Sequence, residues 1–259
     1  MFKNSDYDKL KQIMNESPEK EELLLRLLDS HQMSLSMISH EIRNPLTLVY
    51  SSLQFIESMH PEVHNFRYWS DMHQDIEYLI LLLDELSAYN NGSKLHLSVI
   101  DSGIFFQRLV LSFAASLSAQ NIEFVSKLSP SLPFIECDEI KLREVFTNLL
   151  TNAREALLTD SDYYPNYKPR IRFSVSANSD HLHITIEDNG CGIPNEHIDN
   201  IFEPFVTYKK NGTGLGLAIT ARIIESHHGT ISVSSSPGTG TTFTLTLPVK
   251  QDTQYKTGC

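Results

Sequence analysis

Residues 212–217 have the sequence GTGLGL, and the apolar spacing that follows them is helical. Backbone N–H groups at the start of a helix form an anion site, and glycines allow the chain to approach a phosphate closely. A dinucleotide-binding fold has a similar loop, but directly after a strand and inside a βαβ unit. Here the loop follows IFEPF, residues 201–205, and a polar stretch. The sequence therefore argues against a dinucleotide fold and favours another phosphate-binding architecture.

Segments of strand and helix character alternate on both sides of this loop. We expect strands near residues 97–100, 122–128, 134–137, 171–177, 183–188, 230–234 and 241–247, and helices near 102–119, 139–158 and 215–227. The last two strands show clear period-two alternation, and Asp138 is suited to cap the helix that follows it. This order predicts a helix layer over a mixed sheet, which is an α/β sandwich.

Two further polar motifs lie in the same region. In NLLTNAREA, residues 148–156, Asn148 and Asn152 are four apart and share one helix face, where amide oxygens can bind Mg²⁺. Such a pair alone also fits a solvated face. In DNGCGI, residues 188–193, the carboxylate of Asp188 can accept a hydrogen bond from an amine such as that of adenine, although the motif alone also fits a tight turn. With the glycine loop, the three motifs in this order indicate a nucleotide site.

Residues 17–91 predict two long helices. Ser17 can cap the first helix, Pro18 suits its first position, and apolar residues then recur at spacings of three and four. The pattern repeats over residues 69–86, so we expect an antiparallel helical hairpin. Because a hairpin alone leaves one apolar side wet, we predict a homodimer in which two hairpins form a four-helix bundle. The alternative is a monomer whose hairpin packs on its own second domain.

One histidine of the first helix has chemically suitable neighbours. His40 lies two residues from an apolar residue on either side, so at roughly 100° per residue it points away from the apolar seam. An exposed imidazole is partly uncharged near neutral pH and can act as a nucleophile. Glu41 could hold its ring N–H, and Asn44, one turn on, could orient a water molecule. A lone exposed histidine usually has no role and the chain has 11, so the flanking residues decide.

The motifs together resemble a known family. Residues 95–248 resemble the ATP-binding domain of histidine kinases, in the wider group that includes DNA gyrase, a heat-shock chaperone and the mismatch-repair ATPase. The SHEIRNPL stretch, residues 39–46, resembles the histidine box of the same kinases. The likeness is greatest to sensor kinases of the nitrogen-regulation and sporulation kind. It implies a HisKA-type hairpin followed by a Bergerat-type domain that binds ATP and Mg²⁺.

The resemblance also implies roles for individual residues. Asn152 would bind Mg²⁺, Asp188 would contact the adenine amine, and Lys209 and Lys210, on a short lid at residues 206–213, would either reach the phosphates or remain solvated. The nucleotide contacts that it implies are Asn148, Asn152, Asp188, Gly190, Gly192, Lys209, Lys210, Thr213, Gly214, Leu215, Gly216, Leu217 and Thr241.

The resemblance implies that the chain phosphorylates itself on His40 and passes the group to an aspartate of a response regulator receiver domain. A phosphatase activity is compatible with the same resemblance. The chain has no room for a receiver domain, so we expect a separate protein. Input would come from a sensor partner protein, unless the chain is a piece of a longer one. Two alternatives are an ATPase or serine kinase of the same nucleotide-binding group without phosphohistidine, and a non-enzymatic phosphotransfer scaffold.

Composition restricts partners and location. The net charge of −11 argues against nucleic-acid binding. Apolar runs fall short of the roughly 18–20 residues that span a bilayer, the N-terminus is polar, and the 3 cysteines are widely spaced. We therefore expect a cytoplasmic protein without membrane insertion. The expected order is a polar segment (1–16), the hairpin (17–91), the ATP-binding domain (95–248) and a tail (249–259).

Overall fold

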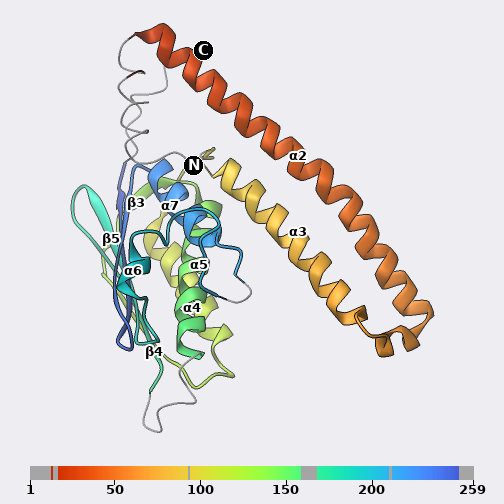
Figure 1. Cartoon of the computed structure of the whole chain (residues 1–259). Helices are drawn as coiled ribbons and strands as arrows, with labels where there is room; N and C mark the ends of the chain where they lie inside the picture. Colours follow the sequence, from red (N-terminus) through yellow and green to blue (C-terminus); the bar gives the residue numbers. More distant parts are fainter. Residues whose placement is uncertain (1–12, 14–16, 93, 159–167, 210–211, 251–259) are drawn as a thin grey trace. The chain divides into compact units, whose positions relative to one another are not determined.

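The computed structural model describes residues 13, 17–92, 94–158, 168–209 and 212–250 (Figure 1). The chain divides into two compact units, residues 1–91 and residues 92–259. The segments predicted as a polar N-terminus and a tail lie almost wholly outside the described residues.

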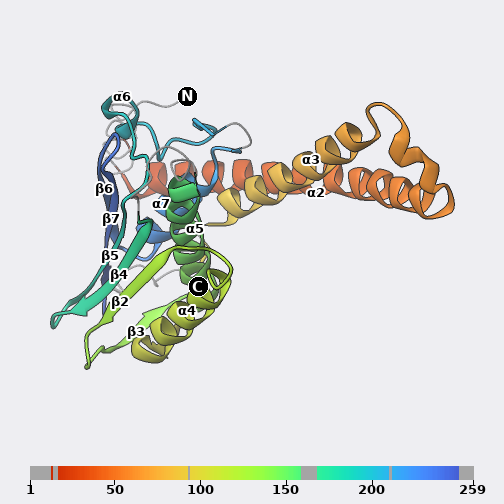
Figure 2. The same cartoon turned by 90° about the horizontal axis from the view of Figure 1, so that it is seen from below.

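The first unit is a helical hairpin. Helix α2 spans Pro18–Met59, and the Ser17 Oγ caps it by accepting a hydrogen bond from the Lys20 N–H at 3.3 Å. The short 3-10 helix η1, Pro61–Asn65, turns the chain into helix α3, Trp69–Asn91, which packs along α2 (Figures 1 and 2). Proline fits the first position of both α2 and η1 because the N–H that it lacks would have no helical partner there. The predicted hairpin is confirmed.

The side of α2 that faces α3 differs from the predicted apolar seam. Ser39 is 1% exposed and Leu53 is 8% exposed, whereas Ile38 and Ile42 are 51% and 46% exposed in the single chain. One residue along a helix turns the side chain by about 100°, so the apolar stripe lies beside the α3-facing side and not on it. An apolar stripe that stays exposed on a single hairpin agrees with the sequence analysis, and its covering by a second copy stays a prediction.

Polar side chains set the register of the two helices. The Arg43 Nη2 lies 2.5 Å from the Asp84 Oδ1, and the Arg43 side chain is only 21% exposed. The Tyr50 hydroxyl donates to the Glu77 Oε1 at 2.6 Å. These contacts occupy the side of α2 facing α3, which explains why part of the apolar stripe stays outside.

The second unit contains a five-stranded mixed sheet in the order β2-β4-β5-β7-β6. Only β2 and β4 are parallel, and the other neighbouring strands are antiparallel. The strands are β2 (Glu123–Leu128), β4 (Arg170–Ala177), β5 (His181–Asp188), β6 (Thr230–Ser236) and β7 (Gly240–Pro248). Strands β1 (Ser98–Asp101) and β3 (Phe134–Cys137) form a separate antiparallel pair.

Three helices cover one face of this sheet (Figure 2). They are α4 (Ser102–Ser116), α5 (Glu139–Leu158) and α7 (Gly216–Ser226). Alternate residues of the central strands point at the helices and form the core, among them Ile171, Phe173, Val175, Leu182, Ile184, Ile186, Leu245 and Leu247, against Leu142, Phe146, Leu149, Leu150 and Leu157 of α5. The predicted α/β sandwich is confirmed; the four-residue helix α6, Asn195–Ile198, was not predicted.

A buried histidine joins the end of α7 to the start of α5. The Asp138 N–H donates to the Nε2 of His227 at 3.0 Å, and the Nδ1 of His227 lies 2.8 Å from the Ile223 carbonyl oxygen. Both contacts suit a neutral ring that carries its proton on Nδ1. Burial lowers the pKa of His227, because the charged imidazolium is poorly solvated there.

Asp138 caps α5, as predicted, by accepting a hydrogen bond from the Lys141 N–H at 3.1 Å. Its second carboxylate oxygen accepts from the His96 N–H at 2.8 Å. Burial raises the pKa of the Asp138 carboxyl, but these backbone hydrogen bonds outweigh burial and the pKa is lowered overall. The cap is therefore ionised throughout the neutral range.

The His227 contact predicts a pH-dependent stability. The unfolded histidine has a pKa of about 6.5, above that of the folded one, so the unfolded chain binds the extra proton first. Stability from neutral His227 is therefore complete above about pH 6.5 and is lost as the pH falls below it. Urea unfolding between pH 8 and 5.5 should show this loss in the wild type and a smaller loss in His227→Gln. The exposed-residue control His181→Gln should behave like the wild type; equal pH slopes for His227→Gln and the wild type would contradict the assignment.

Candidate functional site

Helix α5 carries a polar edge beside its buried apolar face. Asn148 and Asn152 lie one turn apart, and the Nδ2 of Asn152 is 3.5 Å from the Oδ1 of Asn148. The Nδ2 of Asn148 donates to the Thr220 hydroxyl of α7 at 2.9 Å. A Cβ at Gly216 would come within 2.9 Å of the same amide. The structure thus brings the two predicted asparagines together, and Asn148 also ties α5 to α7.

Asp188 ends strand β5 and is 5% exposed. Its Oδ1 accepts from the Gly190 N–H at 2.9 Å. Burial raises the pKa of Asp188 to about 6, although backbone hydrogen bonds from Gly190 and Thr241 act in the opposite direction. A carboxylate with this pKa is mostly ionised at pH 7, and it can accept a hydrogen bond from a buried amine.

Two predicted glycines lie where backbone packs on backbone. At Gly190 a Cβ would meet the carbonyl oxygen of Ala156, in α5, at 2.6 Å. At Gly192, which has a φ of 70°, a Cβ would overlap the carbonyl oxygen of Ser236. Only glycine fits these positions, because any other residue would collide with main-chain atoms that cannot rotate away. The glycines therefore hold the loop after β5 against α5 and β6.

A backbone hydrogen bond joins the glycine loop before α7 to the residue that immediately precedes the lid. The Phe205 N–H donates to the Gly214 carbonyl oxygen at 2.9 Å, and Gly214 has a φ of 72°. Leu215 is fully buried and Leu217 is half-buried. Leu215 therefore belongs to the core through its side chain, so a nucleotide contact there would have to use its backbone. The loop places the first turn of α7 beside the polar edge of α5.

Lys209 connects the predicted lid to α5. Its Nζ lies 2.7 Å from the Oδ1 of Asn152 and 2.6 Å from the Oε2 of Glu155. Glu155 was not predicted as a site residue, because a glutamate on an exposed helix edge carries no distinctive signal. Lys210, which was predicted beside Lys209, lies outside the described residues.

The lid has a second contact on its other side. The ring of Tyr208 stacks on the ring of His197, in α6, with centroids 3.5 Å apart and an interplanar angle of 16°. Thr213 at the far end of the lid approaches Leu215, whose N–H lies 3.4 Å from the Thr213 hydroxyl. Neither His197 nor Tyr208 was predicted to take part in the site.

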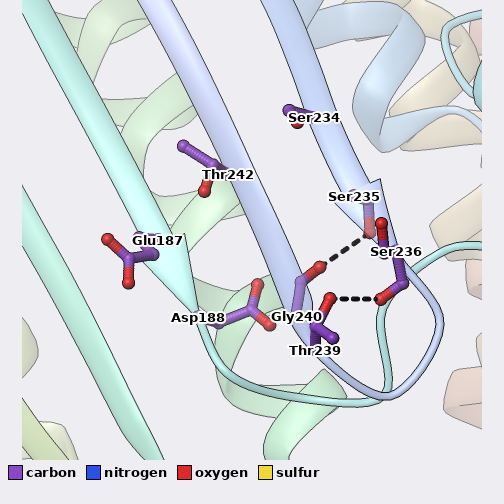
Figure 3. A pocket seen from close by; sticks show the side chains of 8 residues that line it. All are labelled: Glu187, Asp188, Ser234, Ser235, Ser236, Thr239, Gly240 and Thr242. Carbon is purple, nitrogen blue, oxygen red and sulfur yellow. Dashed lines mark hydrogen bonds between the residues drawn. The ribbon is translucent and has the colours of Figure 1, made fainter.

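A shallow polar groove lies on the open face of the sheet (Figure 3). Glu187, Ser234 and Thr242 are paired across three strands and share that face, and Asp188 is also among the residues that line the groove. The volume of about 190 Å³ is below the roughly 300–1,000 Å³ of small-molecule pockets. The groove is therefore small for a nucleotide, and it shares Asp188 with the predicted nucleotide site.

His40 is exposed on α2, in the first unit. Glu41 and Asn44 are exposed as well, whereas the preceding Ser39 is buried and donates to the Leu35 carbonyl oxygen at 2.8 Å. The expected orientation of His40 is thus present, and the ring is open to a reaction partner.

Within the described parts of the chain, no group of three or more His, Cys, Asp or Glu side chains could hold a metal ion. Mg²⁺ needs no such group when it binds through one side-chain oxygen, substrate phosphates and water. The Oδ1 of Asn152, which already accepts from an ammonium, fits that role.

None of the described helices is long and apolar enough to cross a membrane.

Residues 137–251 match the family described as histidine kinase-, DNA gyrase B- and HSP90-like ATPase. The chain is 34% identical over 214 residues to the signal transduction histidine-protein kinase AtoS of Escherichia coli, covering 82% of this chain and 34% of AtoS. It is 30% identical over 247 residues to sporulation kinase A of Bacillus subtilis, covering 92% of this chain and 38% of that kinase. The chain thus spans little more than a third of the length of these relatives.

Solved structures share the fold. Full-length ShkA in complex with AMPPNP has a TM-score of 0.66 and 23% identity, covering 83% of this chain and 45% of ShkA. The histidine kinase ThkA, in its complex with the response regulator TrrA, has a TM-score of 0.60 and 22% identity, covering 92% of this chain and 67% of ThkA.

Two glycines with similar backbone angles allow the close packing at the site to be tested. Gly192 and Gly238 have φ values of 70° and 72°, but a Cβ at Gly238 would meet nothing within 4 Å. Gly238→Ala should lower the free energy of unfolding by about 1–2 kcal/mol through backbone strain alone. Gly192→Ala should lower it by about 1–3 kcal/mol more, because the methyl group collides with Ser236. Urea unfolding of the two variants measures the difference, and equal losses would mean that the Ser236 contact is not tight.

Proposed function

Because this chain belongs to the histidine kinase family, we propose that it is an ATP-dependent protein histidine kinase that phosphorylates itself on His40 and passes the group to a response regulator. The observation that carries this proposal is the occurrence of both parts of such an enzyme in one chain. An exposed histidine with the flanking residues of the histidine box lies on α2, and residues 137–251 match the ATPase family.

ATP binding is supported by the arrangement of the polar groups on the helix side of the sheet. We assign the adenine amine to Asp188, which is buried, largely ionised at neutral pH and close to Thr241. We assign the phosphates to the backbone N–H groups around Gly214 and Gly216, at the start of α7. Asn152 would hold Mg²⁺, which when bound would neutralise charge on the phosphates.

The proposed reaction transfers one phosphoryl group. A neutral ring nitrogen of His40 attacks the γ-phosphorus of ATP, a P–N bond forms, and the bond from the γ-phosphorus to the β,γ-bridging oxygen breaks to release ADP. The other ring nitrogen carries the proton that the product must lose. Glu41, the next residue, is suited to hold that N–H and take up the proton. Asn44 is suited to orient water for the hydrolysis of phosphohistidine.

We propose a receiver domain of a separate response regulator as the acceptor. ThkA, which shares the fold of this chain, is described in complex with the response regulator TrrA, and this supports the choice of partner class. The P–N bond of phosphohistidine suits the role because it is labile and its group passes readily to a carboxylate.

We further propose that two copies pair through the hairpin. Ile38, Ile42, Val49 and Ile56 are 39–51% exposed in the single chain and repeat with helical spacing along one stripe of α2. Such a stripe costs free energy in water and is typical of a bundle seam. His40 is offset by about 200° from Ile38 around the helix, so pairing through the stripe would leave the imidazole accessible.

Replacing His40 tests the proposed activity directly. In His40→Gln, labelling by [γ-³²P]ATP should fall to background, because the amide side chain has no nucleophilic ring nitrogen, while binding of an ATP analogue should be unchanged. The label on the wild type should be acid-labile and base-stable, as expected for phosphohistidine.

His60→Gln is a matched control, since His60 is an exposed histidine at the end of the same helix, and it should be labelled like the wild type. Acid-stable label, or label that survives in His40→Gln, would favour the serine kinase alternative. An unlabelled wild type that binds no ATP analogue would favour the scaffold.

The pKa of Asp188 predicts how nucleotide affinity depends on pH. The ionised carboxylate accepts the adenine amine hydrogen bond more strongly than the protonated acid does, so affinity should be constant above about pH 7 and fall as the pH drops through about 6. Dissociation constants of a fluorescent ADP analogue between pH 5 and 8 measure this. Asp188→Asn should bind more weakly at pH 8 and lose the change near pH 6, whereas Asp180→Asn, at an exposed turn, should retain it. An unchanged pH profile in Asp188→Asn would exclude this role.

A further inference from the structure

We propose that Asn152 and Glu155 form a cation seat that the Lys209 ammonium fills in the absence of nucleotide, and that Mg²⁺ arriving with the nucleotide displaces this ammonium and thereby releases Lys209 from α5. The inference rests on the proposed nucleotide site and adds two elements to it. Glu155 becomes a positioning residue for the metal, and the Lys209 ammonium becomes a group that occupies the seat until the metal displaces it.

The geometry of the contact indicates that two oxygen ligands bind one cation, and not that Lys209 forms an ion pair with a single carboxylate. Asn152 and Glu155 are three residues apart on α5, so their side chains lie on neighbouring parts of one helix face. One amide oxygen and one carboxylate oxygen both lie within 2.7 Å of the same nitrogen, the Nζ of Lys209. Oxygen atoms that converge on one small cation are also the ligands that Mg²⁺ prefers.

The contact is weak enough to be exchanged. The side chains of Lys209 and Glu155 are 51% and 45% exposed, so water screens their attraction. A divalent ion that shares its ligands between the seat and the phosphates of a nucleotide is attracted more strongly than a single ammonium on a long flexible stem. The ammonium therefore competes with the metal without blocking it.

The exchange would change how Lys209 is held. Tyr208, the residue before Lys209, stacks on His197 of α6. Two consecutive described residues of the lid, Tyr208 and Lys209, thus contact two different helices. Loss of the Lys209 contact would leave Tyr208 stacked on His197, so displacement by the metal frees the Lys209 side chain while its neighbour stays in place.

A surface ion pair that merely steadies the lid is the simpler explanation, and it makes a different prediction. Removing either partner of such a pair breaks the same contact, so both variants would change metal binding in the same direction. In a cation seat the two variants act oppositely, because Lys209 competes with Mg²⁺ whereas Glu155 attracts it.

The test measures the Mg²⁺ concentration that half-saturates binding of a fluorescent ADP analogue to the full chain. ADP has no γ-phosphate, so a contact from Lys209 to that group cannot enter the result. Lys209→Gln should lower the required Mg²⁺ concentration by about 2- to 5-fold, in line with an exposed ion pair. Glu155→Gln should raise it by about 2-fold or more. Lys141→Gln, which removes a lysine 3.5 Å from Glu144 on the same helix, should leave it unchanged.

Binding of the ADP analogue in EDTA serves as the second measurement, and each shift in Mg²⁺ concentration is taken relative to the metal-free affinity of the same protein, which separates an effect on the metal from one on the pocket. Shifts of the same sign in Lys209→Gln and Glu155→Gln, or no shift in either, would overturn the cation seat while the nucleotide site stands. A wild type that binds no ADP analogue at any Mg²⁺ concentration would overturn the proposed nucleotide site, and the cation seat with it.

Discussion

Main chain packed directly on main chain at the end of β5 is the constraint from which the geometry of the candidate site follows. Gly190 lies against the Ala156 carbonyl of α5, and Gly192 lies against the Ser236 carbonyl of β6. Peptide groups cannot move aside as side-chain rotamers can, so these contacts keep the loop at one distance from the helix. Asp188, which immediately precedes that loop, is therefore presented at a set position relative to the polar edge of α5. The buried carboxylate and the asparagines become parts of one site through this packing.

Elements with a strong local signal could be predicted from the sequence. The Ser17 cap, the Asp138 cap and the glycine loop before α7 each depend on residues within one or two helical turns, and the structure places the corresponding helix starts within one residue of the prediction. The short helix α6 was missed because four residues hold too little periodicity to be distinguished from a turn. Strand pairing was beyond prediction as well, since the parallel contact of β2 with β4 joins segments that a helix and another strand separate.

Contacts that depend on long-range packing could not be predicted in the same way. The side of α2 that meets α3 is centred near Ser39 and not Ile38, and nothing local distinguishes a seam within one hairpin from a seam between two copies. The roles of Glu155 and His227 also emerge only in three dimensions, because each depends on a partner far along the chain. Predictions from motifs thus identified which residue types meet at the site, and tertiary packing determined which of them are engaged with one another.

The two-point attachment of α5 to α7 has a consequence for the thermodynamics of ligand binding. The helices are joined near their middles through Asn148 and Thr220, and again through Asp138, at the start of α5, and His227, at the end of α7. Two anchors on a pair of packed helices suppress rocking of one helix against the other, so the wall of the site is already ordered before a ligand arrives. Binding then removes little conformational entropy from this scaffold, and the entropic cost falls on the ligand and on the side chains that rearrange around it.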